Sequence, residues 1–236
     1  MAAPDTVASL ASSSLPPGVA EALLNDVSEL WLLSAEAEVL AGDLAHCHPQ
    51  LGPDEVRASV RPASGAFRLT VVARDRPGLL AATAGALASR GLSVLAASVT
   101  TWPARDLALQ GITFVGGPGQ TGHDEVIADV MGALADDRRP SIGFKPSGPV
   151  TVVASPAPLG HSLVTVEAPD RIGLLWAVTS WFAGHGDNVV AAQLSEVGGR
   201  AKDLFLVHGA PDADELAAFL AGLGPRKGLL RRRVRI

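Results

Sequence analysis

The stretch ARDRPGLLAATAGALASRGLSVLAASV, residues 73–99, returns later in the chain as APDRIGLLWAVTSWFAGHGDNVVAAQL, residues 168–194. Asp75 corresponds to Asp170 and Gly78 to Gly173, a constant offset of 95 positions without insertion or deletion. Residues 75–97 are identical to their counterparts at 11 of 23 positions, whereas ordinary composition gives about two. The sequence therefore predicts one structural unit that occurs twice.

Both copies show the same succession of patterns. A β-branched run (FRLTVVA or HSLVTVEA) predicts a strand, and the apolar stripe after the turn predicts a helix that ends at Gly91 or Gly186. Two apolar strands, a second helix and a last strand follow, the last strands being expected at residues 148–155 and 229–236. This order predicts an α+β fold of two ferredoxin-like βαββαβ units, preceded by a short helical N-terminal segment.

The remaining sequence divides around the repeat. Residues 1–18 are small and polar and end in Pro-Pro-Gly, which predicts a flexible tail. Residues 19–65 carry apolar residues at helical spacing and then several turn formers, which predicts a helical segment and a linker. We place the first unit at residues 66–157 and the second at 158–236.

Composition excludes several classes of protein. With 47% hydrophobic and 18% charged residues the chain is too apolar to be disordered, and its net charge of -5 argues against a nucleic-acid partner. No apolar run reaches the roughly 18 residues that a membrane span needs, and the first residues lack the pattern of a signal peptide, so we expect a cytoplasmic protein with no membrane contact. The single cysteine, Cys47, cannot form an internal disulfide, which agrees with a reducing compartment.

Catalytic and metal motifs are weak. The glycine-rich run at residues 116–125 has His123 where a phosphate-binding loop places lysine. His46, Cys47 and His48 are adjacent, and adjacent residues rarely bind one metal. We therefore expect no catalytic residues, no metal and no cofactor.

The turn before each first helix is the candidate binding site. Backbone N–H groups at a helix N-terminus suit a carboxylate, and Gly78 and Gly173 would let a ligand approach that backbone closely. Asp75 and Asp170 could accept hydrogen bonds from an ammonium group. The structural alternative is that each aspartate caps its helix and that Pro77 only fixes φ.

The string Asp-Arg-Pro-Gly-Leu-Leu, followed by a helix, a glycine and a Val-x-Ala-Ala strand, resembles the ACT domain, a small regulatory amino-acid-binding module. The resemblance covers roughly residues 66–236 and is greatest to the tandem ACT pair of bacterial uridylyltransferase/uridylyl-removing enzymes, which sense glutamine. The residues before the repeat are too few for the catalytic domains of that family.

The resemblance implies a ligand between two units, held by the turn of one and the second strand of the other. On the second strand, the position of a ligand-contacting asparagine falls at Asn188 in copy two and at Ser93 in copy one. Copy one lacks the asparagine and copy two lacks the proline. Two hypotheses therefore remain: one functional site is built from both copies, or one of the two sites is vestigial. The implied turn residues are Asp75, Arg76, Pro77, Gly78, Leu79 and Leu80 in copy one, and Asp170, Arg171, Ile172, Gly173, Leu174 and Leu175 in copy two.

The predicted function is that of a non-catalytic regulatory protein that binds a small amino acid, glutamine first, and signals in amino-acid or nitrogen metabolism. A homodimer or a partner enzyme is expected. The alternatives are a ligand-free dimerisation or interaction module and a regulatory subunit of a separate enzyme.

Overall fold

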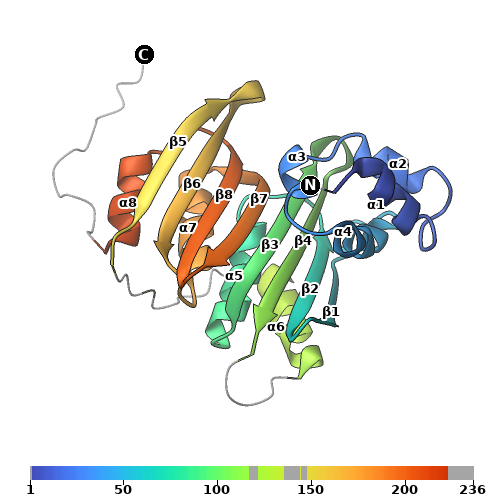
Figure 1. Cartoon of the computed structure of the whole chain (residues 1–236), viewed down its shortest axis with the longest axis horizontal. Helices are drawn as coiled ribbons and strands as arrows, with labels where there is room; N and C mark the ends of the chain where they lie inside the picture. Colours follow the sequence, from blue (N-terminus) through green and yellow to red (C-terminus); the bar gives the residue numbers. More distant parts are fainter. Residues whose placement is uncertain (1, 117–121, 136–143, 145–147, 223–236) are drawn as a thin grey trace.

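The computed structural model describes residues 2–116, 122–135, 144 and 148–222. Its strands form one antiparallel sheet in the order β1-β2-β4-β3-β7-β8-β6-β5 (Figure 1). In chain order they are β1 (Arg57–Ala63), β2 (Ala66–Ala73), β3 (Ser93–Trp102), β4 (Leu107–Val115), β5 (Thr151–Ala157), β6 (His161–Pro169), β7 (Asn188–Val197) and β8 (Arg200–His208).

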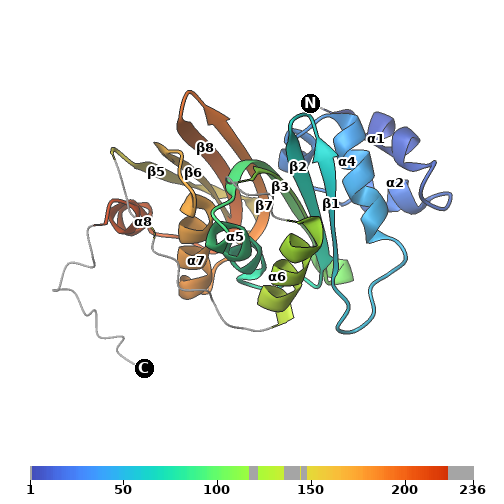
Figure 2. The ribbon, with the colours of Figure 1, turned by 90° about the horizontal axis from the view of Figure 1, so that it is seen from below.

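Helices line one face of this sheet in both units, as Figure 2 shows from below. The helices α5 (Leu79–Ser89) and α6 (His123–Ala135) cover strands β1 to β4, which we call the first unit. The helices α7 (Leu174–His185) and α8 (Ala213–Leu220) cover strands β5 to β8, the second unit. The predicted α+β class with two ferredoxin-like units is confirmed.

The outer strand of each unit differs from the prediction. The strand at 151–157 does not return to the first unit, because β5 pairs with β6, and β1 takes the corresponding place beside β2. Both are local hairpins, and Ser64 and Gly65 between β1 and β2 have the positive φ angles of a tight hairpin turn. Local pairing costs little loop entropy, and within the described residues each unit has the order ββαββα. The expected strand at 229–236 lies outside the described residues.

The N-terminal segment is folded, which corrects the expectation of a flexible tail. Residues Pro4–Ala11 form α1, with proline at the first helical position, and bury Val7 and Ala11. Three further helices and a 3-10 turn complete a helical layer, which consists of α1, α2 (Val19–Leu24), α3 (Glu29–Leu32), α4 (Ala37–Leu44) and η1 (Ala45–Cys47). The layer lies on the face of the first unit opposite to α5 and α6 (Figure 2).

The burial of β2 and of β6, the corresponding strands of the two units, shows which part of the sheet this layer covers. In β2 nearly every residue is buried, because Leu69 and Val71 face α5 and α6 whereas Thr70 and Val72 face the helical layer. In β6 buried and more exposed residues alternate, as expected of a strand covered on one face only. The helical layer therefore lies mainly on the first unit and reaches the second unit at β7 through α3, whereas β5 and β6 keep one open sheet face.

A buried ionic network joins the helical layer to the sheet. Asp43 of α4 is fully buried and forms an ion pair with Arg68 of β2, which is 3% exposed. Its other oxygen accepts hydrogen bonds from Arg61 at 2.9 Å and from Thr70 at 2.8 Å. Gly111 on β4 leaves room for this pair, because a Cβ there would collide with both charged groups.

The two units meet at strands β3 and β7. Residues Ala96–Thr100 pair antiparallel with Ala191–Ser195, and α5 packs against α7 on the covered face. One continuous apolar core extends through both units. In the described part of the chain, no helix is long and apolar enough to span a membrane.

Candidate functional site

The two repeated turns have the same backbone geometry. Gly78 and Gly173 stand immediately before α5 and α7 with φ angles of +86° and +89°. Only glycine adopts this left-handed conformation without strain. A Cβ at Gly78 would lie 3.5 Å from the Cβ of Ala183, an ordinary contact, so backbone conformation is what requires glycine here.

The aspartates of the turns are not helix caps. Neither α5 nor α7 has a side-chain capping hydrogen bond, and the residue before each helix is the glycine. The Asp75 carboxylate instead accepts hydrogen bonds from Asn188 Nδ2, at 3.2 Å to each of its oxygens. Asn188 begins β7, so the contact joins the turn of copy one to the second strand of copy two, the juxtaposition that the resemblance implied.

This contact forms one side of a pocket between the units, which we call the first interunit pocket. It is lined by the predicted residues Asp75, Arg76, Gly78, Leu79, Leu80 and Asn188, together with Thr101 and Gln110. Pro77 is exposed and does not line it. Thr101 and Gln110 are 4% and 1% exposed, and their side-chain oxygens have no hydrogen-bond partner. Buried polar atoms are normally paired, so these two oxygens mark a place where a polar ligand can bind.

The electrostatics of the first interunit pocket centre on Asp75. Burial raises the pKa of this carboxyl above its usual range, whereas the hydrogen bond from Asn188 acts in the opposite direction. The negative charge of Asp106 also raises this pKa. A ligand ammonium group beside Asp75 would stabilise the carboxylate that burial disfavours.

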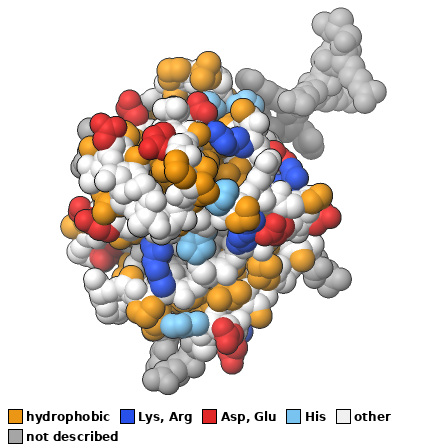
Figure 3. Space-filling model, turned by 90° about the vertical axis from the view of Figure 1, so that its right-hand side faces the viewer, with side chains coloured by type: hydrophobic (Ala, Val, Ile, Leu, Met, Phe, Trp, Pro, Cys, Tyr) orange, Lys and Arg blue, Asp and Glu red, His pale blue; other side chains and the backbone are white. Residues whose placement is uncertain are grey.

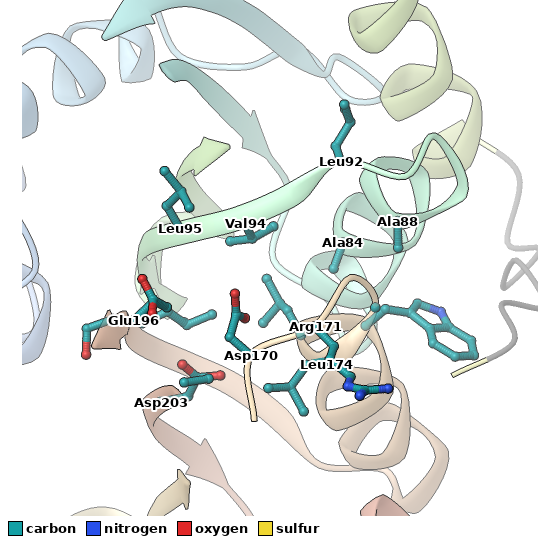
Figure 4. A pocket seen from close by; sticks show the side chains of 16 residues that line it. Ala84, Ala88, Leu92, Val94, Leu95, Asp170, Arg171, Leu174, Glu196 and Asp203 are labelled. Atoms are coloured by element: carbon teal, nitrogen blue, oxygen red, sulfur yellow. The ribbon is translucent and has the colours of Figure 1, made fainter. Parts of the chain in front are cut away.

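The turn of copy two lines a related pocket, the second interunit pocket (Figure 4). Of the predicted residues, Asp170, Arg171, Gly173, Leu174 and Leu175 line it. Ile172 is 47% exposed and does not, and Ser93 pairs with Val115 at the start of β3 without lining this pocket. Copy one thus supplies no counterpart of Asn188 here.

Acidic groups take the place of the neutral ones in the second interunit pocket. Asp203 faces Val166 across β6 and β8, just as Gln110 faces Val71 across β2 and β4. Figure 4 shows Asp170, Asp203 and Glu196 on the same side of the pocket, whereas the Arg171 guanidinium points away from them. Burial, and then the charge of Asp170, raise the pKa of Asp203 to about 8.

Both interunit pockets are narrow. Their cavities measure about 10 Å³ for the first and about 20 Å³ for the second, room for one or two water molecules. Neither cavity as it stands has room for a molecule as large as an amino acid. Within the described residues, no group of three or more histidine, cysteine, aspartate or glutamate side chains is arranged to hold a metal ion.

The fold and the paired turns define an α+β protein with two ferredoxin-like units that each present a glycine turn at a pocket between the units. The ACT domain family matches residues 67–123, which lie in the first unit. The predicted resemblance to this module is confirmed.

Among known proteins, the chain is similar to bifunctional uridylyltransferase/uridylyl-removing enzymes. It is 29% identical over 209 residues to the enzyme of Bordetella pertussis, covering 80% of this chain and 24% of that protein. It is also 29% identical over 174 residues to the enzyme of Ralstonia nicotianae, covering 65% of this chain and 20% of that protein. The chain thus spans about a quarter of the length of the relatives it matches.

A solved structure, the aspartate kinase from Synechocystis, shares 18% sequence identity with a TM-score of 0.42. The match covers 67% of this chain and 27% of that one.

Proposed function

We propose that this chain is a non-catalytic regulatory module that binds a small amino acid in the first interunit pocket, with glutamine as the first candidate. The observation that carries the proposal is the pair of buried, unpartnered oxygens of Thr101 and Gln110 beside the Asp75–Asn188 contact. Such atoms are costly when they are left unpaired, and a polar ligand would remove that cost.

The pocket offers a partner for each group of an amino acid. The first N–H groups of α5, directly after Gly78, suit the α-carboxylate. The Asp75 carboxylate suits the α-ammonium group. Gln110, Thr101 and the Asn188 amide can exchange hydrogen bonds with a polar side chain, and a carboxamide both donates and accepts such bonds.

Binding at this place would act on the packing of the units. A ligand shifts an equilibrium only through its different affinity for two states. A ligand that contacts the turn of the first unit and β7 of the second favours packings that keep both contacts. A change in this packing would also reach the helical layer, because Gln193 of β7 donates a hydrogen bond to the Leu33 carbonyl at 3.3 Å.

A ligand-free interaction module, or a regulatory subunit of a separate enzyme, is the second candidate. The open sheet face of the second unit favours it, because Val153 and Leu163 there are 53% and 37% exposed. The matched relatives are enzymes about four times as long as the matched segment. This length agrees with a regulatory subunit that acts together with a separate catalytic protein. We expect this module to act in the cytoplasm, as a homodimer or with that partner.

Thermal unfolding against each free amino acid tests the proposal, with the four tryptophans as reporters. A ligand at 100 times its Kd adds about 2.7 kcal/mol of stability, a shift of several degrees. Glutamine should raise the Tm of the parent and of Ser93→Ala, the matched control outside the pockets, but not that of Asn188→Ala. A panel in which no amino acid raises the Tm would reject amino-acid binding and support the interaction module.

A further inference from the structure

A third cavity, of about 400 Å³, lies between the helical layer and the first unit. None of its lining residues lines either interunit pocket. Its walls come from α2, from η1 and the segment after it, from the residue after β2, and from the β3–β4 connection, which contains η2 (Pro103–Arg105). The volume falls within the range of small-molecule pockets. We call it the helix-layer cavity.

Part of the lining of the helix-layer cavity is apolar. Leu23, Cys47, Leu51 and Leu107 are all buried, and Val19, which also lines the cavity, is half-buried. Burial raises the pKa of the Cys47 thiol to about 12, so that this side chain stays neutral and belongs to the apolar wall. A ligand that fills this part must present hydrocarbon.

The lining also carries charged residues. Arg74, directly after β2, and Arg105, in η2, both line the cavity, and Asp106 is the acidic residue among the lining side chains. Arg74 donates through Nε to the Pro53 carbonyl at 2.7 Å and forms an ion pair with Asp106. Arg105 donates through Nη2 to the Ala22 carbonyl at 2.9 Å.

These contacts fix the two guanidinium groups without exhausting them. A guanidinium has five N–H donors, and the contacts described use two on Arg74 and one on Arg105. The remaining donors suit a carboxylate, which pairs with arginine through two parallel hydrogen bonds. Figure 3, which looks at the side of the helical layer, shows basic and histidine side chains near the middle of that face.

We propose that the helix-layer cavity binds a small organic carboxylate with an apolar body, its head group held by Arg74 and Arg105. Two guanidinium groups against the single carboxylate of Asp106 leave the lining with a net positive charge, which disfavours an ammonium ligand. The apolar residues Leu23, Leu51 and Leu107 disfavour an inorganic anion. The inference is independent of the proposed function, since the two sites share no residue.

Isothermal titration of the whole chain with hexanoate, hexylammonium and hexan-1-ol tests this site. Hexanoate should bind saturably and hexylammonium should not, and hexan-1-ol should bind at least about tenfold more weakly than hexanoate because it lacks the charge. Absence of saturable hexanoate binding, or equal binding of hexan-1-ol, would overturn the proposal.

Three variants place the binding in this cavity. Ala104→Trp fills it from the exposed η2 turn, and Arg105→Gln removes one charge but keeps a donor; each should weaken hexanoate binding at least about tenfold. Arg200→Gln removes an exposed arginine that does not line the cavity and should bind as the parent does. Arg105→Gln leaves the apolar lining residues in place, so it still tests whether hexanoate binds in this cavity if Ala104→Trp unfolds. Unchanged hexanoate binding in Arg105→Gln would overturn the assignment.

Discussion

Asn188 donates hydrogen bonds to both carboxylate oxygens of Asp75 at 3.2 Å, and the two residues belong to different copies of the repeat. The turn of copy one is therefore completed by a residue that copy one does not contain. In copy two the corresponding aspartate, Asp170, faces Glu196 and Asp203 instead. Two nearly identical sequence motifs thus form two chemically different pockets.

Removal of the Asn188 amide should raise the pKa of Asp75 further. The hydrogen bond from Asn188 favours the charged carboxylate and partly offsets burial, which acts in the opposite direction. In Asn188→Ala, a pH titration of the Asp75 carboxyl by carbon NMR should therefore give a higher midpoint than in the parent. The Asp170 carboxyl, in the other pocket, is the internal control, and an unchanged or lower Asp75 midpoint would contradict the contact.

Asp203 should make the protein less stable as the pH rises. Its folded-state pKa, about 8, lies above the ordinary value of 3.8, so the folded chain retains a proton that the unfolded chain loses. That stabilisation is complete below about pH 4 and is lost as the pH approaches 8. Urea unfolding should show Asp203→Asn to be more stable than the parent by about a few kcal/mol at pH 8, and similar to it at pH 4.

The reciprocal variant checks the cause of this pH dependence. Gln110 occupies the corresponding place in the first unit and is 1% exposed. Gln110→Glu buries a carboxyl where the parent has a neutral amide, so its stability relative to the parent should fall as the pH rises from 5 to 8. If both variants followed the parent at every pH, burial of Asp203 would not be the source of the effect.

The two glycines of the turns should not tolerate a Cβ. Gly78 and Gly173 have φ angles of +86° and +89°, so Gly78→Ala and Gly173→Ala should each lower the free energy of unfolding by about 1–2 kcal/mol. Gly132 is the matched control, because it lies inside α6 and a Cβ added there would meet no other atom within 4 Å. Gly132→Ala should raise the free energy of unfolding by about 0.5–1 kcal/mol. Loss of stability in all three variants would point to crowding instead of backbone conformation.

Much of the fold and half of the candidate site could be predicted from the sequence. The ungapped repeat located both turns and both first helices, and the resemblance to the ACT domain implied that Asn188 lies near a turn of the other unit. The sequence did not identify Gln110 and Asp203 as corresponding residues, because the number of positions between them differs from the 95 that separate the two turns. The hairpin between β7 and β8 has two residues between paired ends, whereas that between β3 and β4 has four, so the constant spacing ends there.

The outer strands and the first helix could not be predicted for other reasons. A strand pattern such as residues 151–157 shows that a strand forms but not which neighbour it pairs with, and the short hairpin to β6 decided that. In residues 1–18 the buried residues Val7, Ala11 and Leu15 recur every four positions. Three apolar residues among many small ones form too weak a pattern to predict a helix from the sequence. Packing against α4 makes this segment helical.

The ionic network beneath the helical layer should control the stability of the first unit. Asp43 is fully buried, and its partner Arg68 would be left as an unpaired buried charge in Asp43→Ala. Breaking a buried pair in this way costs about 3–5 kcal/mol, so urea unfolding of Asp43→Ala should show a loss of that size. Asp26→Ala removes an exposed carboxylate of the same layer and should change stability by less than about 0.5 kcal/mol. Equal, small effects of both variants would mean that the helical layer is held by its apolar contacts alone, with Trp31, Leu40 and Leu44 at their centre.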